Sequence, residues 1–180
     1  MIGVLVSGEG TNLQALIDAE LRIAAVASNR AGVRALERAA AASIPAAAFP
    51  IEEFAAREDR DGAMADWLEG RGVRFVVLAG YMHLLRPNFL ARFPGRVVNT
   101  HSAPLPGFPG AHPIEDVLAA GVAETAATIH YVDDGIDTGA VIATEPVPVL
   151  AGDTPDSLRA RVQAAEHRLL PVVVRELTDA

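Results

Sequence analysis

The chain has 180 residues, of which 51% are hydrophobic, so it is long enough to bury a sizeable core, and we expect a single domain over residues 1–180. Its formal net charge of −8 and its lack of clustered basic residues exclude general nucleic-acid binding, because affinity for a polyanion rests on grouped Lys and Arg side chains. The absence of cysteine excludes disulfides, thiolate nucleophiles and Cys-based zinc sites, and we expect no metal.

The N-terminal segment, residues 2–6, is a short apolar run typical of a strand that is buried on both faces. It lacks the basic start of a signal peptide, and no apolar run in the chain reaches the ~18 residues that a membrane-spanning helix needs. We therefore expect a cytoplasmic protein without membrane contact.

A glycine-rich turn, residues 7–12, separates this strand from a helix predicted by the apolar spacing of Leu13, Leu16 and Ile17. Backbone N–H groups at such a helix start, together with the helix dipole, favour phosphate binding. The dinucleotide-binding fingerprint is only half met, because Leu13 occupies its third glycine position and no acidic residue follows the next strand, residues 23–27. The alternative is a tight connection that binds nothing.

The middle of the chain alternates between helical and extended patterns. Such alternation favours a mostly parallel, twisted sheet with helices on both faces, in which ligands bind at the carboxyl ends of the strands. The predicted helices cover residues 32–42, 57–70 and 88–93, and the predicted strands cover residues 47–49, 74–80 and 97–98.

Two polar residues follow the strand formed by Val97 and Val98. Because side chains alternate along a strand, we expect Asn99 and His101 on the same side and in one site. Residues 102–113 contain four prolines and two glycines, so the chain leaves the sheet there as a stiff, irregular loop. Loops of this kind on a rigid scaffold usually carry function.

The C-terminal part predicts a helix over residues 113–120, then an antiparallel hairpin of strands 125–132 and 140–144, and a final helix that begins at Pro155. The hairpin turn, residues 133–139, contains three carboxylates. Taken alone, this turn is typical of a solvated connection.

Five short segments, spread over nearly the whole chain, form one pattern. They are residues 7–13, residues 78–82, Asn99 with His101, residues 109–110, and Asp137 with Gly139. In this order and spacing the chain resembles the glycinamide ribonucleotide formyltransferases, a folate-dependent family. The resemblance implies an α/β, Rossmann-like formyltransferase fold. Methionyl-tRNA formyltransferase and formyltetrahydrofolate deformylase share the Asn, His and Asp core, but each carries a further domain for which we expect no room here.

The resemblance implies transfer of a formyl group from 10-formyltetrahydrofolate to the amine of glycinamide ribonucleotide in de novo purine biosynthesis, without a covalent enzyme intermediate. Asn99 and protonated His101 would stabilise the oxygen of the tetrahedral intermediate, and His101 would also act as general acid. Asp137 would favour the imidazolium by opposite charge and could relay the amine proton.

The resemblance also assigns the binding residues. The ribonucleotide would contact Gly10, Thr11 and Asn12 through its phosphate and Glu166 through its ribose. The folate would contact Arg57 through its glutamate tail and would otherwise be bound by Met82, His83, Leu84, Leu85, Asn99, Val132, Asp133 and Asp134.

Three residues depart from the family pattern. Ser102 stands where the family usually has Pro, and His83 stands where it often has Arg. Glu9 places a carboxylate beside the proposed phosphate site, which weakens binding unless the side chain points to solvent. Of the other histidines, His112 and His130 favour a structural role, although His130 could face the site across the hairpin.

Two other functions stay open. One is a formyltransferase that acts on another amine, such as an amino sugar nucleotide. The other is a nucleotide-binding module that uses only the turn at residues 7–12 and catalyses nothing. We expect small-molecule substrates as partners and a monomer or homodimer.

Overall fold

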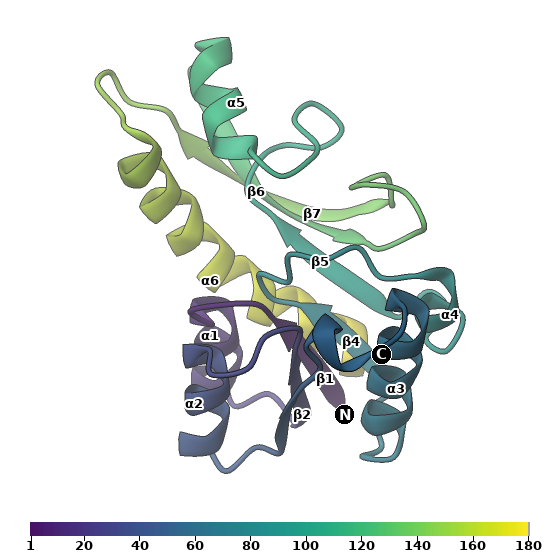
Figure 1. Ribbon diagram of the computed structural model, residues 1–180. Coiled ribbons are helices and arrows are strands. Elements are labelled where there is room, and N and C mark those ends of the chain that lie inside the picture. The colour runs from purple at the N-terminus through teal and green to yellow at the C-terminus, as the bar shows by residue number, and fades with distance from the viewer. Residues whose placement is uncertain (180) are drawn as a thin grey trace.

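Within residues 1–179, which the computed structural model describes, seven strands form one mixed sheet (Figure 1). The strands are β1 (Ile2–Val6), β2 (Ile23–Ser28), β3 (Ala46–Ala48), β4 (Phe75–Leu78), β5 (Val97–His101), β6 (Glu124–Tyr131) and β7 (Val141–Pro148). Their spatial order is β3-β2-β1-β4-β5-β6-β7. Neighbours from β3 to β5 run parallel, whereas β6 pairs antiparallel with both β5 and β7.

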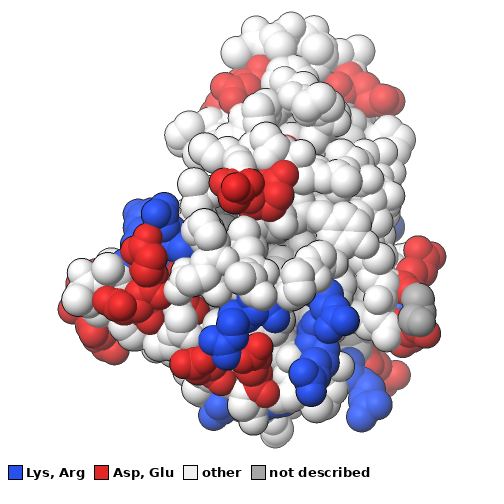
Figure 2. All heavy atoms as spheres, turned by 90° about the vertical axis from the view of Figure 1, so that its right-hand side faces the viewer, with Lys and Arg blue, Asp and Glu red and all other residues white. Residues whose placement is uncertain are grey.

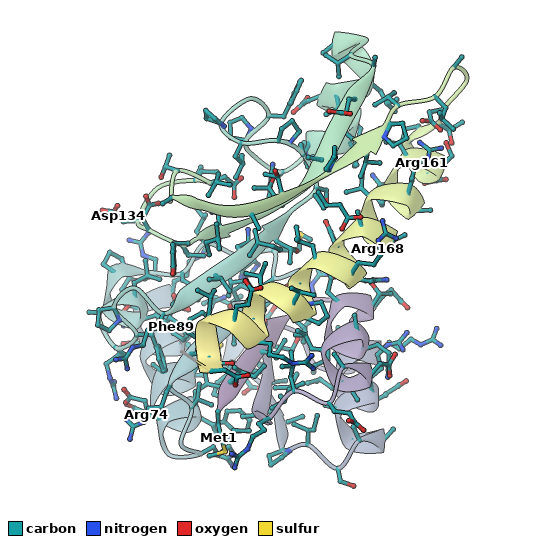
Figure 3. All side chains as sticks on the ribbon, turned by 180° about the vertical axis from the view of Figure 1, so that it is seen from behind. Met1, Arg74, Phe89, Asp134, Arg161 and Arg168 are labelled. Carbon is teal, nitrogen blue, oxygen red and sulfur yellow. The ribbon has the colours of Figure 1, made fainter. Side chains whose placement is uncertain are left out.

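Helices cover both faces of the sheet, as a largely parallel sheet requires. They are α1 (Thr11–Asp18), α2 (Arg34–Ala41), the short 3₁₀ helix η1 (Ile51–Glu53), α3 (Arg57–Glu69), α4 (Pro87–Leu90), α5 (Pro113–Ala120) and α6 (Pro155–Asp179). The side chains of β1 alternate between two hydrophobic cores, because Val4 and Val6 pack with α1, α2 and α6, while Leu5 packs with α3 and α4. Helix α6 runs across the back of the sheet (Figure 3).

The strand order reverses beside β1. From β1 the chain proceeds outward to β2 and β3, and then returns to β4 on the other side of β1. At such a switch point, the loops after two adjacent strands leave in opposite directions and open a crevice at the carboxyl ends. The glycine-rich turn and Asn99 both lie at this edge, as predicted.

The predicted α/β class, the mostly parallel sheet and the C-terminal antiparallel hairpin are confirmed, with differences in extent. Strand β5 continues to His101 instead of ending at Val98, so both polar residues are strand residues. Strand β7 continues past the predicted end at Thr144, although it contains Pro146 and Pro148. An edge strand tolerates proline because one side of it needs no N–H donor, and β7 is the edge of the sheet.

On the face of the molecule drawn in Figure 2, acidic and basic side chains are interspersed, and uncharged residues cover much of the upper half. None of the helices in the described part of the chain combines the length and the apolar composition needed to cross a membrane.

Candidate active site

A cavity of about 740 Å³ opens at the carboxyl ends of β1, β4 and β5. Its walls come from the turn at residues 7–12, the segment after β4, residues 99–102, the loop between β6 and β7, and one side of α6. Of the residues predicted for the site, all but Arg57 line this cavity. The described residues contain no group of three or more His, Cys, Asp or Glu side chains placed to hold a metal ion.

Asp137 lies in the loop between β6 and β7, where its backbone is left-handed with φ of 53°. Its Oδ2 lies 3.5 Å from His101 Nδ1 and accepts the backbone N–H of Gly110 at 2.9 Å. Its Oδ1 lies 3.5 Å from His130 Nε2. Burial alone raises the pKa of this carboxyl, but the His130 contact, the Gly110 N–H and the charge of His101 outweigh burial and lower the pKa. Asp137 is therefore an anion at neutral pH.

His101 is held in one orientation by a backbone carbonyl. Its Nε2 lies 2.6 Å from the carbonyl oxygen of Phe108, and because a carbonyl oxygen only accepts, Nε2 carries a proton. The other ring nitrogen, Nδ1, then faces the Asp137 carboxylate. A second proton on Nδ1 gives an imidazolium that this carboxylate stabilises by opposite charge.

His130 belongs to the same group, although the sequence favoured a structural role for it. In the antiparallel pairing of β5 with β6, His130 stands directly opposite Asn99, and its Nε2 lies 3.2 Å from the Asn99 amide nitrogen. Its Nδ1 lies 2.8 Å from the carbonyl oxygen of Tyr131, so Nδ1 carries a proton. Nε2 lies beside both the Asn99 amide and the Asp137 carboxylate, so His130 orients the amide next to that carboxylate. Only the register of β5 against β6 reveals this contact.

The stability that Asp137 contributes is expected to disappear in acid. Because its pKa is lowered in the folded state, the contribution is fully present above the pKa of an unfolded Asp, about 3.9, and is lost as the pH falls through the folded pKa. Urea unfolding of the wild type and of Asp137→Asn, from about pH 7 to about pH 3, measures this. The difference between their free energies of unfolding should narrow below about pH 4. A constant difference would contradict a lowered pKa.

The glycine-rich turn ends in Gly10, at the start of α1. Gly10 has φ of +71°, and a Cβ on it would lie 2.6 Å from the Cβ of Ala35 and 2.8 Å from its Cα. Asn12 donates from Nδ2 to Glu166 at 2.9 Å, whereas its buried Oδ1 has no partner among the described residues. The helix N–H groups favour an anion, and Asn12 Oδ1 offers an acceptor to a hydroxyl or amine of the same ligand.

Gly10→Ala is expected to lower the free energy of unfolding by roughly 3 kcal/mol, because a left-handed backbone and an overpacked contact are both penalised. Gly32→Ala is the matched control, since Gly32 has φ of +66° but no atom within 4 Å of an added Cβ. The control should lose only about 1 kcal/mol from the backbone alone. Urea unfolding compares the two, and equal losses would show that contact with Ala35 does not constrain the turn.

Glu166, on α6, is a buried carboxylate. Its Oε2 accepts from Asn12, and its Oε1 accepts from the Ser102 hydroxyl at 2.7 Å. Ser102, which departs from the family pattern, therefore orients Glu166 in the cavity wall. Glu9 pairs with Arg34 at 3.6 Å, and both side chains are largely exposed, so the Glu9 carboxylate lies in solvent.

The segment after β4 forms an apolar wall. The side chains of Met82 and Leu84 line the cavity and are 75% and 51% exposed, so they offer apolar surface to a ligand. Asp134 is exposed at the outer end of the loop between β6 and β7 (Figure 3). Arg57 is exposed on α3 and does not line the cavity, whereas Arg30, after β2, does. No motif singles out Arg30.

An amide, two imidazoles and a carboxylate surround one cavity at the switch point of an α/β sheet, an arrangement typical of an enzyme active site. Such a site can donate hydrogen bonds to a carbonyl oxygen and move a proton. The family model described as formyl transferase matches residues 1–174. The chain therefore belongs to the formyl transferase family.

Relatives share most of this chain. The phosphoribosylglycinamide formyltransferase of Mycobacterium tuberculosis (strain CDC 1551 / Oshkosh) is 44% identical over 179 residues, which cover 97% of this chain and 83% of that protein. The trifunctional purine biosynthetic protein adenosine-3 of Drosophila pseudoobscura pseudoobscura is 43% identical over 94% of this chain, which spans only 13% of that relative's length. The crystal structure of glycinamide ribonucleotide transformylase 1 from Symbiobacterium toebii superposes with a TM-score of 0.95 at 43% identity, covering 97% of this chain and 85% of that chain.

Proposed function

We propose that this protein transfers the formyl group of 10-formyltetrahydrofolate to the amine of glycinamide ribonucleotide, a step of purine biosynthesis. The observation that carries the proposal is the Asp137 carboxylate 3.5 Å from the His101 imidazole, in a cavity that Asn99 also lines. The names of the relatives that share most of the chain support glycinamide ribonucleotide as the acceptor of the formyl group. We further propose that the chain acts as one formyltransferase domain.

The ribonucleotide would occupy the end of the cavity at α1. The backbone N–H groups of Gly10, Thr11 and Asn12 suit a phosphate, because they belong to the positive end of a helix dipole. The free Oδ1 of Asn12 and the carboxylate of Glu166 suit the hydroxyl groups of a ribose. The ordering of Glu166 by Ser102 supports this assignment.

The folate would occupy the end of the cavity at the segment after β4. The exposed side chains of Met82 and Leu84 suit a flat aromatic ring, and the chain's bend there leaves backbone groups for polar contacts. His83, Leu85, Val132, Asp133 and Asp134 line the same end. When bound, the folate supplies the formyl carbon. Arg57 would meet its glutamate tail from outside the cavity.

Each polar side chain then has a part in the chemistry. Asn99, oriented by His130, donates to the formyl oxygen as negative charge develops there. Once the amine has bonded to the formyl carbon, His101, with Nε2 bonded to Phe108, gives its Nδ1 proton to the folate nitrogen as the bond between that nitrogen and the formyl carbon breaks. Asp137 places a negative charge beside the His101 ring and accepts the proton that the amine releases.

The proposal is tested by mixing the protein with glycinamide ribonucleotide and a 10-formylated folate, and following the absorbance of the deformylated folate. Turnover that requires both substrates is expected, and no turnover with both present would contradict the proposal. An amino sugar nucleotide as the better substrate would favour a formyltransferase for another amine. Ribonucleotide binding that survives His101→Gln, together with no folate binding, would favour a nucleotide-binding module.

A further inference from the structure

The largest fully buried side chain in the described part of the chain is an arginine outside the site considered so far. Arg60 and its neighbour Asp61, both on α3, are 0% exposed. Taking two charges out of water is costly, and an apolar pair of similar volume is often at least as stable. Stability alone therefore does not explain why a charged pair occupies this position.

The pair joins α3 to the segment between β4 and α4. Arg60 donates from Nε and Nη2 to Asp61 Oδ1, at 2.9 and 2.6 Å. Its remaining terminal nitrogen, Nη1, lies 2.6 Å from His83 Nδ1. The other carboxylate oxygen of Asp61 accepts the backbone N–H of Arg86 at 2.8 Å. The side-chain hydrogen bonds of Arg60 and Asp61 therefore join the two residues to each other or to residues 82–86.

Residues 82–85 lie outside helices and strands, and Arg86 is the residue that precedes α4 and accepts its first helical N–H, so individual contacts set the position of most of this segment. At the start of the segment, Met82 donates its N–H to Ser7 Oγ at 2.8 Å. The Arg60 and Asp61 contacts hold the middle, at His83, and the end, at Arg86. Between these points lie Leu84 and Leu85, which line the proposed folate end of the cavity.

The contact with Arg60 also fixes the protonation of His83. A guanidinium only donates, so His83 Nδ1 must accept, and the ring is neutral with its proton on Nε2. Burial and the charge of Arg60 lower the pKa of His83, and a lower pKa also favours the neutral ring. The cavity wall therefore contains a neutral imidazole whose Nε2–H is available to donate to a ligand.

We propose that Arg60 and Asp61 are positioning residues for the formyl donor: they hold residues 82–86 and the His83 ring in the arrangement that binds the folate. This inference rests on the proposed function. The pair touches no residue assigned to the ribonucleotide, so its removal should affect one substrate and not the other.

The test replaces both charges by apolar residues of similar volume in Arg60→Met/Asp61→Leu. The variant should stay folded, because no charge is left unpaired, although the Arg86 N–H and His83 Nδ1 lose their partners. The KM for 10-formyltetrahydrofolate should rise about tenfold or more, while the KM for the ribonucleotide and kcat stay within about twofold. Arg92→Met is the matched control. It also removes an arginine that pairs with acidic residues of α3, namely Asp66 and Glu69, but this pairing lies at the surface. It should keep both wild-type KM values.

If the double variant does not fold, two further measurements still test the proposed role of Arg60 and Asp61. His83→Leu leaves the pair's own bonds in place and should also raise the KM for the folate. In the wild type, imidazole ¹⁵N NMR at neutral pH should show His83 with Nδ1 unprotonated and Nε2 protonated. Provided that the wild type turns over, either of two results would overturn the inference. One is an unchanged KM for the folate in the double variant or in His83→Leu, and the other is a proton on His83 Nδ1. A wild type without turnover overturns the proposed function and, with it, this role.

Discussion

Asp137→Asn is expected to lower kcat about a thousandfold or more, while the binding of both substrates changes little. An asparagine has the shape of the carboxylate, and its side-chain oxygen still accepts the Gly110 N–H that positions the loop. It has no negative charge to place beside the His101 ring, and it cannot take up the amine proton. Steady-state kinetics give kcat, and isothermal titration with each substrate gives the affinities.

Glu145→Gln is the control for Asp137→Asn, because it also removes one carboxylate from this part of the sheet. Glu145 lies on β7 and pairs with Arg168 on α6, and neither residue lines the cavity. Its kcat should equal that of the wild type. Turnover of Asp137→Asn near the wild-type rate would exclude the proposed role of Asp137.

His101→Gln should lower kcat/KM by a similar factor, about a thousandfold, because both the donor to the formyl oxygen and the general acid are lost. Affinity for the ribonucleotide should be kept, since the phosphate would bind at Gly10, Thr11 and Asn12. His112→Gln is the control, as His112 is exposed and does not line the cavity.

The combination of His101→Gln with Asp137→Asn distinguishes one proton-transferring unit from two independent groups. If Asp137 acts mainly through the His101 imidazolium, the double variant should be about as slow as the slower single variant. Losses that multiply would show that the two side chains act separately, with Asp137 receiving the amine proton by itself.

Much of the fold could be read from local patterns. The apolar run at β1 alternates between two cores, and the β–α alternation gives a parallel sheet whose carboxyl edge gathers the ligand-binding loops. Strand alternation similarly brought Asn99 and His101 into one cavity. The end of β7 was predicted too early, because a proline excludes an inner strand but not an edge strand, and position in the sheet is not a local property.

Local sequence patterns do not predict the contacts that complete the site. His130 joins Asn99 through the register of two antiparallel strands, and Ser102 joins Glu166 over 64 positions of the chain. Arg60 gives no sign in the sequence of being buried, since an arginine on a helix is usually exposed.

By itself, the sequence determined the α/β class, the turn suited to phosphate and the residue types able to carry the chemistry, because these follow from periodicity and from side-chain functional groups over a few residues. Only the tertiary structure decided the partner of each group: which imidazole orients Asn99, which carbonyl fixes His101 and which buried pair supports residues 82–86. Such partners depend on strand register and helix packing, where a shift of one residue replaces every neighbour.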